Sequence, residues 1–517
     1  MTLLAIENLS LSIRGTPILR DVSMTVGPGE ILGVIGESGS GKSLTAFSVL
    51  QLLPEGSECN GRVTLLGQDI LAMPEKDLCS MRGRQVGMVF QEPMTALNPV
   101  QTIGAQVAET ILIHEPNTSK ADAMLRAAQA LTRCELPQDK FPLGRYPHEM
   151  SGGQRQRVVI AMAIALQPKL LIADEPTTAL DVTTQAEILD LLARLVREDD
   201  MGLMLISHDL AVVTDMAHRI AIMKNGEVVE TGDADLHRTM SHPYTKALFE
   251  ASGHQPDRAV APSHDLLLQV KNAVRDYTLP RKTLFGAAGK FRAVDDVSFE
   301  IRRGESLGLV GESGCGKSTL TRAILGLEPL QGGSILLDGQ PVGPTVRRKM
   351  QVVFQDPYGS FNPRHKVARL VAEPFHLLGR KATPAELDEA LISVGLTPAD
   401  KDKYIHEFSG GQRQRIAIAR ALMIKPELIV LDEAVSALDV SIRAQILDLL
   451  ADLSDEFGLT YLFISHDLSV VRAITDRCLV MKAGKIVEEG ETEHLFTTPS
   501  HPYTQTLIAA APQLPGA

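Results

Sequence analysis

Cysteine and long apolar runs are scarce in this sequence of 517 residues. The five cysteines are an odd number without a Cys-x-x-Cys pair, which favours reduced thiols and gives no zinc-binding signature. The longest apolar stretch, Val158–Leu166, is followed by Gln167, Pro168 and Lys169 and falls well short of the ~18 residues that a membrane span needs. We therefore expect a chain that does not itself cross a membrane.

A secretion signal and an excess of positive charge are also absent. Residues 1–13 lack a basic region followed by an apolar core, so we expect the protein to stay in the cytosol. The net charge of −12 argues against a nucleic-acid partner, because nucleic-acid-binding surfaces are basic. The length and the fractions of 44% hydrophobic and 22% charged residues predict a soluble globular protein with two domains.

The sequence contains the same motifs twice, in the same order. "GESGSGKS" at Gly36–Ser43 returns as "GESGCGKS" at Gly311–Ser318, and "SGGQRQR" at Ser151–Arg157 returns at Ser409–Arg415. The copies of the second motif are 258 residues apart (409 − 151). The same distance separates Glu175 from Glu433 and His208 from His466. Such regularity indicates a duplicated domain.

A segment rich in proline, serine and charge separates the two copies. Residues 250–265 show neither a helical nor a strand period. We predict a first domain at residues 1–250, a linker at 251–265 and a second domain at 266–517.

Each half shows the same alternation of strands and helices. An alternating strand (residues 3–13 and 266–277) precedes a buried strand that runs directly into the glycine-rich segment, and helical stretches lie at 119–134 and 384–394. The apolar runs "KLLIADE" and "ELIVLDE" predict further buried strands. This alternation predicts an α/β core with a parallel sheet.

The glycine-rich segments carry the strongest signal. A strand, G-x-x-x-x-G-K-S and a helix predict a P-loop, in which backbone N–H groups and the positive end of the helix bind phosphate. A simple glycine turn is disfavoured because the pattern occurs twice. The lysines are expected to reach the β and γ phosphates, and Ser43 and Ser318 to hold Mg²⁺. The predicted nucleotide-binding residues are Gly36, Ser38, Gly39, Gly41, Lys42, Ser43, Gly311, Ser313, Gly314, Gly316, Lys317, Ser318 and Thr319.

An acidic pair ends the apolar strand that follows each P-loop. Asp174 is expected to reach the magnesium ion, and Glu175 to polarise an attacking water. Asp432 and Glu433 repeat the pair. A solvated strand end is the other interpretation, but the preceding P-loop favours a catalytic pair.

With these motifs in order, the sequence resembles the ATP-binding-cassette (ABC) family along nearly its whole length. The resemblance implies two tandem P-loop ATPase domains, each a mixed or parallel α/β sheet core with a helical signature subdomain, that bind ATP and Mg²⁺. In that family "SGGQ" is the signature motif, which contacts the γ phosphate of ATP held by the opposite domain. Its residues here are Ser151, Gly153 and Gln154, and Ser409, Gly411 and Gln412.

The same resemblance implies roles for further positions. Gln91 and Gln355 match the Q-loop, which senses magnesium and touches the membrane part of the transporter, and His208 and His466 match the switch histidine. The D-loop motif "ALD" occurs at Ala179–Asp181 and Ala437–Asp439.

Two sequence differences distinguish the halves. Tyr277 matches the aromatic residue on which the family stacks adenine, whereas the first half offers Ile13, so we expect weaker binding at the first site. Cys315 lies inside the second P-loop, where oriented amides at a helix N-terminus are expected to lower the pKa of its thiol.

"HPYT" at His242–Thr245 and His501–Thr504, together with "LNP" at 97–99 and "FNP" at 361–363, resembles the oligopeptide, dipeptide and nickel branch of bacterial importers. From chemistry alone, His-Pro merely starts a short surface helix. The fused arrangement most resembles the ATPase of the microcin C type peptide importer, with glutathione-type importers as an alternative. No cysteine follows either "HPYT", so we expect no iron–sulfur cluster there.

The resemblance also implies partners, a location and a competing class. The partners are two integral membrane permease subunits and a periplasmic or extracellular solute-binding protein, with this chain peripheral at the cytoplasmic face of the inner membrane. The alternative is a soluble twin-cassette protein acting on ribosomes or DNA. Ribosome-binding members have a long charged linker between their cassettes, and DNA-repair members have zinc-binding cysteine pairs; this sequence has neither feature.

The two halves are expected to close head to tail around two ATP molecules. Each P-loop set then faces the signature motif of the other half. One site combines Lys42, Gln91, Asp174, Glu175 and His208 with Ser409–Gln412, and the other combines Lys317, Gln355, Asp432, Glu433 and His466 with Ser151–Gln154.

Overall fold

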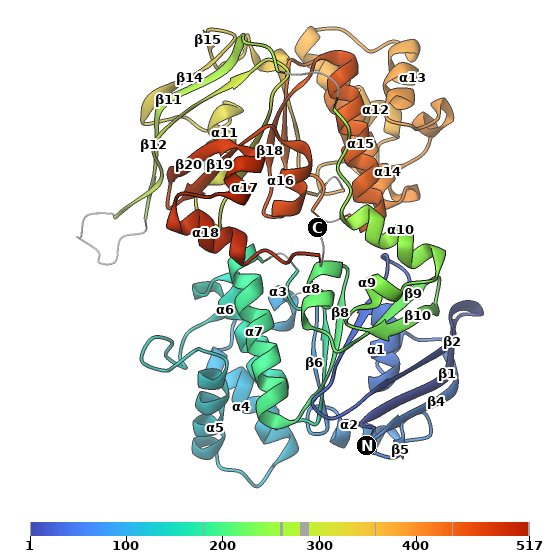
Figure 1. Ribbon diagram of the computed structural model, residues 1–517. Helices are drawn as coiled ribbons and strands as arrows, with labels where there is room; N and C mark the ends of the chain where they lie inside the picture. The colour runs from blue at the N-terminus through green and yellow to red at the C-terminus, as the bar shows by residue number, and fades with distance from the viewer. Residues whose placement is uncertain are drawn as a thin grey trace. The chain divides into compact units, whose positions relative to one another are not determined.

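The computed structural model describes residues 2–91, 93–178, 180–258, 262–279, 289–356, 358–436 and 438–514. The chain forms two compact units, one running to Gly253 and including the C-terminal tail from Pro512, the other comprising His254–Ala511. Each unit is described by itself, with the labels of Figure 1. Within the described ranges, every helix is too short or too polar to cross a bilayer.

The first unit contains two sheets. The six-stranded sheet has the order β10-β9-β3-β8-β7-β6 and is parallel except for β10, and a separate antiparallel sheet has the order β2-β1-β4-β5. The strands are β1 Leu4–Ile13, β2 Thr16–Val26, β3 Ile31–Ile35, β4 Ser57–Leu65, β5 Gln68–Asp69, β6 Val86–Val89, β7 Leu170–Asp174, β8 Gly202–Ser207, β9 Arg219–Lys224 and β10 Glu227–Asp233.

Helices α4, α5 and α6 gather on one side of this unit, and the antiparallel sheet lies on the other (Figure 1). The helices are α1 Lys42–Leu50, α2 Glu75–Met81, α3 Pro93–Ala96, α4 Ile103–His114, α5 Lys120–Arg133, α6 Gly152–Ile164, α7 Val182–Asp199, α8 Leu210–Met216, α9 Leu236–Thr239 and α10 Pro243–Ser252, with the 3-10 turn η1 Pro147–Glu149.

The second unit repeats this arrangement strand for strand. Its sheets have the orders β16-β17-β18-β13-β19-β20 and β12-β11-β14-β15. The strands are β11 Leu266–Thr278, β12 Lys290–Arg302, β13 Ser306–Val310, β14 Gly332–Leu337, β15 Gln340–Pro341, β16 Met350–Val353, β17 Leu428–Asp432, β18 Thr460–Ile464, β19 Arg477–Lys482 and β20 Lys485–Glu491.

The helical part of the second unit is similar, with more 3-10 structure. The helices are α11 Lys317–Ile324, α12 Val367–Val371, α13 Pro384–Ser393, α14 Gly410–Leu422, α15 Val440–Phe457, α16 Leu468–Ile474, α17 Thr492–Thr497 and α18 Pro502–Ala509, with the turns η2 Arg347–Lys349, η3 Glu373–Leu378, η4 Pro398–Asp402 and η5 Ile405–Glu407. One apolar cluster fills the space between the sheets and α11, and another packs α14 and α15 on the far face.

The predicted buried strands and the helices at 119–134 and 384–394 are confirmed by β3, β7, β13, β17, α5 and α13. The separate antiparallel sheet was not predicted. The alternating strands predicted at 3–13 and 266–277 are confirmed by β1 and β11. In β1 a bulge shifts burial from Leu4 and Ile6 to Leu9 at Asn8, where φ is +52°. Asn272 repeats the bulge in β11 with φ +48°.

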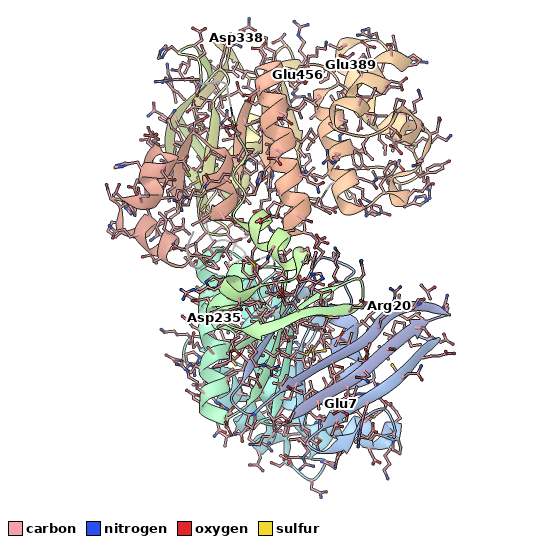
Figure 2. The ribbon with its side chains drawn as sticks, turned by 45° about the vertical axis from the view of Figure 1, so that its right-hand side comes forward. Glu7, Arg20, Asp235, Asp338, Glu389 and Glu456 are labelled. Atoms are coloured by element: carbon pink, nitrogen blue, oxygen red, sulfur yellow. The ribbon has the colours of Figure 1, made fainter. Side chains whose placement is uncertain are left out.

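Charged side chains cover the outside of each unit (Figure 2). Glu7 and Arg20 in the first unit, and Asp338 and Glu456 in the second, are all exposed. Acidic and basic groups are interspersed, as in the Arg20–Glu227 pair at 3.7 Å. Such a surface is typical of a soluble protein.

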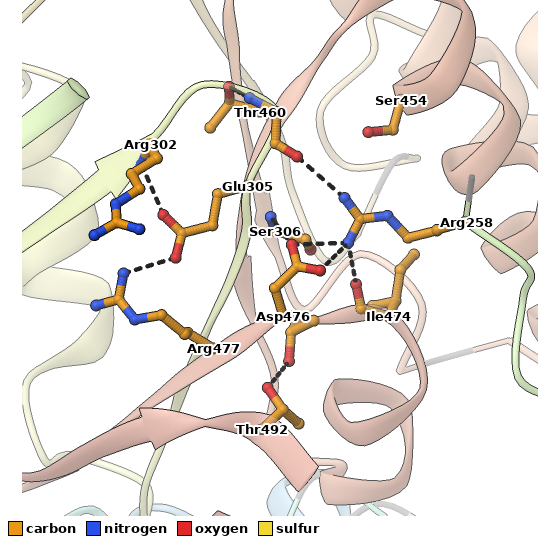
Figure 3. A network of polar contacts seen from close by, with 12 residues as sticks. Arg258, Arg302, Glu305, Ser306, Ser454, Thr460, Ile474, Asp476, Arg477 and Thr492 are labelled. Atoms are coloured by element: carbon orange, nitrogen blue, oxygen red, sulfur yellow. Dashed lines mark hydrogen bonds and ion pairs between the residues drawn. The ribbon is translucent and has the colours of Figure 1, made fainter. Parts of the chain in front are cut away.

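The first part of the predicted linker, residues 251–258, is held by specific contacts. Residues up to Ser252 belong to α10, His254 contacts Asp448 at 2.5 Å, and the Arg258 guanidinium donates to both carboxylate oxygens of Asp476 at 3.0 Å (Figure 3). Residues 259–261 of that linker lie outside the described residues. The segment therefore enters the second unit through specific contacts before its first strand begins.

Arg258 also stabilises the start of the central strand of its unit. It donates to the carbonyls of Gly304 at 3.1 Å and Ile474 at 3.3 Å, while Asp476 accepts the N–H of Ser306 at 2.8 Å. Its side chain is only 12% exposed. In the first unit His218, 258 residues earlier (476 − 218), accepts the equivalent N–H of Ile31 at 3.0 Å.

Replacing Arg258 by alanine should lower the free energy of unfolding of the second unit by about 2 kcal/mol, because Asp476 and two carbonyls lose a charged donor. Urea unfolding followed by pulse proteolysis measures this. Lys366→Ala is the control, since its pair with Asp402 spans 3.7 Å and is exposed, and it should cost under about 0.5 kcal/mol. Equal midpoints for the two variants would contradict the anchoring role.

Candidate functional site

Four of the predicted motifs, namely the P-loop, the acidic pair, the histidine and the Q-loop glutamine, meet at one edge of each six-stranded sheet. Strands β3, β8, β7 and β6 are parallel neighbours in that order, so their carboxyl ends lie side by side. The P-loop follows β3, His208 follows β8, the acidic pair ends β7, and Gln91 stands two residues after β6. In the second unit β13, β18, β17 and β16 place the P-loop, His466, the acidic pair and Gln355 in the same order.

The first P-loop is shaped by its glycines and by the inward lysine. Gly39 and Gly41 have φ of +78° and +101°, which favour glycine, and a Cβ on Gly36 would stand 2.2 Å from the carbonyl oxygen of Met223. Lys42 begins α1 and is 6% exposed, and its Nζ donates to the carbonyls of Gly36 at 2.7 Å and Glu37 at 3.0 Å.

This geometry fits a phosphate group. The N–H groups at the start of α1 are not used inside the helix, and the ammonium group of Lys42 already lies folded onto the loop. Ser38 and Gly39 are exposed, and Ser43 is partly exposed beside Asp174. A bound anion can therefore reach amides, ammonium and hydroxyl from one side.

The second P-loop repeats the arrangement. Lys317 Nζ donates to Gly311 O at 2.5 Å and Glu312 O at 2.9 Å, and Gly314 and Gly316 have φ of +78° and +114°. Ser313, Gly314 and Ser318 are exposed, and Thr319 is partly exposed.

The expected low pKa of Cys315 is wrong. Its thiol is 6% exposed, and burial raises its pKa in spite of Lys317, whose Nζ lies 3.8 Å from the sulfur. The side chain points into the apolar cluster beneath the loop and not toward solvent. Desolvation therefore outweighs the helix N-terminus at this position.

Glu175 has an unusual backbone and several donors on its carboxylate. Its φ is +47°, a left-handed conformation that costs about 1 kcal/mol or more in a residue other than glycine, and its N–H donates to Ile206 O at 2.9 Å. Oε2 accepts from Gln91 Nε2 at 2.8 Å and Thr178 Oγ1 at 3.0 Å and lies 3.3 Å from His208 Nδ1.

The two neighbouring acids have opposite pKa shifts. Burial alone raises the pKa of Glu175, but His208, Thr178 and Lys42 outweigh it and bring the pKa down to about 2. Burial raises the pKa of Asp174, and the adjacent Glu175 charge adds to this, while a hydrogen bond with Ser43 opposes it. The contacts with His208, Thr178 and Lys42 therefore keep Glu175 ionised.

The second unit shares these features. Glu433 has φ of +52°, its carboxylate lies 3.3 Å from His466 Nδ1, and that contact lowers its pKa, whereas burial raises the pKa of Asp432. Ser318, Gln355, Asp432 and Glu433 line one cavity of about 740 Å³.

The signature residues form a helix N-terminus. Ser151 Oγ accepts from Gln154 N at 3.3 Å while Gln154 Oε1 accepts from Ser151 N at 3.1 Å, a capping box at the start of α6. Ser409 and Gln412 repeat it at 3.4 and 3.0 Å in α14.

Gly153 and Gly411 serve packing in the structure. A Cβ on Gly153 would lie 2.2 Å from Thr184 Cγ2, and one on Gly411 would lie 2.5 Å from Ile442 Cγ2. Gly152, by contrast, is exposed at the first position of α6. Both glycines lie within the predicted Ser151–Gln154 segment, but the sequence alone does not show that Gly152 is the exposed one, because it does not show which face of the helix meets α7.

The candidate adenine positions are structurally equivalent but differ in surroundings. Tyr277 and Ile13 are 264 residues apart (277 − 13), as are the bulge residues Asn272 and Asn8 (272 − 8). The Tyr277 hydroxyl donates to Glu328 Oε2 at 2.6 Å, and the Arg275 guanidinium lies 4.9 Å from its ring centre.

Ile13 has no such polar setting. It packs with Leu44 and Leu53 against the apolar cluster of its unit. The two P-loop lysines are 275 residues apart (317 − 42). With the same offset, Leu44 corresponds to Thr319 and Leu53 to Glu328. One unit therefore holds a tethered tyrosine where the other has an aliphatic surface.

Other positions complete the comparison with the sequence. Ala179 and Ala437 of the D-loops lie outside the described residues, whereas Asp181 caps α7 by accepting from Thr184 N at 3.1 Å. The contact of Thr178 with Glu175 was missed. The sequence feature that could have indicated this contact is a hydroxyl residue three positions after the glutamate. Ser436 stands at the same position in the second copy.

Comparisons with known proteins agree with this geometry. The profile described as ABC transporter matches residues 19–178 and 294–436, and that of the oligopeptide/dipeptide transporter C-terminal region matches residues 487–517. The glutathione import ATP-binding protein GsiA of Escherichia coli (strain K12) is 43% identical over 557 residues, covering 98% of this chain and 89% of the relative, and that of Shigella dysenteriae serotype 1 has the same values.

A solved dimer of the cassette MJ0796, in a post-hydrolysis state with ADP and Pi, is 29% identical, covers 45% of this chain and 98% of its own, and has a TM-score of 0.40. The two profile matches and the relatives across nearly the full length show the family. The chain belongs to the ATP-hydrolysing ABC transporter family, in the branch with the oligopeptide/dipeptide transporter C-terminal region.

Proposed function

We propose that this chain energises a peptide importer by hydrolysing ATP at two sites built on Lys42 and Lys317. The observation that carries the proposal is the edge of each six-stranded sheet, where the P-loop, histidine, acidic pair and glutamine meet. The solute is a small peptide-like molecule. Glutathione is the candidate that the relatives' names supply, and a microcin C-like peptide stays a prediction.

Two sets of oxygen donors are suited to Mg²⁺. A hydroxyl, an amide oxygen and a carboxylate are hard ligands of the kind this ion prefers. Bound Mg²⁺ would neutralise charge on the β and γ phosphates. The proposed ligands are Ser43, Gln91 and Asp174 in one site, and Ser318, Gln355 and Asp432 in the other. The contact of Ser43 with Asp174 and the shared cavity of the second set support this assignment.

Glu175 and Glu433 are proposed to orient the attacking water. The contacts that lower the pKa of Glu175 keep it ionised, so its carboxylate can accept a hydrogen bond that polarises the water. Oε2 of Glu175 already accepts from Gln91, which is exposed. Release of Gln91 would free that position, with His208 and His466 holding each glutamate in place.

Hydrolysis is proposed to need both halves. The exposed serine and glycine at the start of α6, and the same residues at the start of α14, can offer N–H groups to a γ phosphate held by the other half. Covalent connection of domains 1–250 and 266–517 through residues 251–265 raises their effective concentration into the ~mM range. The D-loops would lie at that interface.

The remaining parts of the importer lie outside this chain. Two permease subunits and a solute-binding protein are the proposed partners, and this chain would be peripheral at the cytoplasmic face of the inner membrane. The C-terminal region match and the import relatives support transport over an action on ribosomes or DNA.

The test is ATP-driven uptake by the reconstituted complex. The chain is co-expressed with candidate permease subunits, purified in detergent and placed in proteoliposomes with a candidate binding protein. Labelled glutathione and labelled dipeptides are then supplied with and without internal ATP. Co-purification of ribosomes instead of membrane subunits would contradict the proposal.

Glu175→Gln combined with Glu433→Gln should retain ATP binding but lose at least about 100-fold in hydrolysis, because the amide keeps the shape and loses the charge that polarises water. Phosphate release and equilibrium dialysis with labelled ATP measure the two properties. Glu55→Gln with Glu389→Gln removes two exposed charges as a control. Wild-type hydrolysis by the first double variant would overturn the catalytic assignment.

The Lys42 site should bind ATP several-fold more weakly than the Lys317 site, since stacking on an aromatic ring contributes about 1 kcal/mol. Ile13→Tyr should tighten the first site and Tyr277→Ala should loosen the second. Tyr277→Phe keeps the ring without its bond to Glu328 and should fall in between. Fluorescent-nucleotide titration of the full chain reports this, and three unchanged affinities would show that these residues do not contact the base.

A further inference from the structure

The two "HPYT" segments are not used by the function described so far. We propose that Tyr244 and Tyr503 are positioning residues for the two phosphate loops, each holding the peptide group whose carbonyl binds the P-loop lysine. The inference rests on the proposed nucleotide sites and adds to them a residue pair from the C-terminal end of each unit.

The contact is made by a tyrosine hydroxyl and a loop amide. The N–H of Glu37, the second residue of the loop, donates to the Tyr244 hydroxyl at 3.3 Å. The N–H of Glu312 donates to the Tyr503 hydroxyl at 3.1 Å. The tyrosines are 9% and 5% exposed, so their hydroxyls reach the loops from inside the protein. Because the same contact forms in both units, we attribute it to the "HPYT" motif and not to one unit alone.

The amide concerned shares a peptide plane with the lysine's partner. The carbonyl of Gly36 and the N–H of Glu37 belong to one planar group, and that carbonyl accepts from Lys42 Nζ at 2.7 Å. In the second unit the Gly311 carbonyl accepts from Lys317 Nζ at 2.5 Å. A tyrosine hydroxyl that accepts from the N–H of this peptide group therefore fixes the direction of its carbonyl, which accepts from the lysine ammonium group.

The tyrosine is itself held by the residues around it. His242 caps α10, and its Nδ1 accepts from Tyr244 N at 3.2 Å. Glu230 of β10 accepts from Ser241 N at 2.6 Å and from His242 N at 3.2 Å. Burial opposes the ionised form of Glu230, yet hydrogen bonds from Ser241 and His242 bring its pKa down to about 2.

The second unit has the same support. Glu488 of β20 accepts from Ser500 N at 2.7 Å and His501 N at 3.1 Å, and His501 Nδ1 accepts from Tyr503 N at 3.1 Å. Hydrogen bonds from these amides lower the pKa of Glu488 against the effect of burial. The motif thus fixes its tyrosine through the histidine at its start.

A lysine covers each tyrosine ring. Lys224 Nζ lies 4.4 Å from the ring centre of Tyr244, and Lys482 Nζ lies 4.3 Å from that of Tyr503. Each lysine ends the strand paired with the strand that enters the P-loop, β9 beside β3 and β19 beside β13. The ring is therefore held between the sheet and the loop, and the hydroxyl is the only part removed by a change to phenylalanine.

Tyr244→Phe should raise the KM for ATP of the Lys42 site about three- to ten-fold, and Tyr503→Phe should do the same for the Lys317 site, with kcat nearly unchanged. The lysine keeps its charge but loses its fixed rest position, so binding suffers more than chemistry. Both variants are made in the full chain. Hydrogen exchange of peptides covering 36–41 and 311–316 should also become faster, since the amides of Glu37 and Glu312 lose their acceptor.

Tyr461→Phe is the matched control. It removes a buried hydroxyl bond of the same kind, to Leu450 O at 2.9 Å, away from the P-loop. It should lower Tm without changing the KM for ATP. The inference fails if the Tyr244 and Tyr503 variants keep wild-type KM and loop exchange, or if they only lower Tm as Tyr461→Phe does. A wild-type chain that binds no ATP would contradict the proposed function instead.

Discussion

Parallel pairing of four strands determines where every candidate catalytic group stands. Because β3, β8, β7 and β6 run in the same direction, the residues that follow them emerge at one edge, although Gln91 and His208 are more than one hundred residues apart in the chain. Antiparallel pairing of any one of these strands would send its residue to the opposite edge. The second unit has the same order of strands, so the same constraint places its candidate catalytic groups.

Around that edge, the backbone holds the reacting side chains in conformations that they would not adopt alone. Glu175 and Glu433 both have left-handed φ, and each carboxylate stays ionised beside a histidine. The P-loop lysines are folded onto their own loops. Strain and desolvation at these few positions are offset by the packed sheet beneath them, where β3 and β13 are buried along their full lengths.

The two units diverge where the nucleotide base is expected, not where the phosphates are. Tyr277 has a hydrogen bond to Glu328 and a guanidinium beside its ring, while Ile13 joins an aliphatic surface. The phosphate loops, capping boxes and "HPYT" contacts are alike in both. Phosphate chemistry depends on backbone geometry that tolerates little change, whereas a base-binding surface depends on side chains that vary without disturbing the fold.

The sequence by itself determined the duplication, the P-loops and the buried strands, and it predicted the residues of both sites, because each depends on local patterns of glycine, charge and hydrophobic period. It predicted the alternating strands β1 and β11 but not the separate antiparallel sheet, since their pairing with neighbouring strands is not a local pattern. Only the tertiary structure decided that Cys315 is buried and that Gly153 serves packing while Gly152 is exposed. It alone brought Tyr244 to the amide of Glu37, 207 residues away in the chain, because that contact depends on how a terminal helix packs against a distant loop.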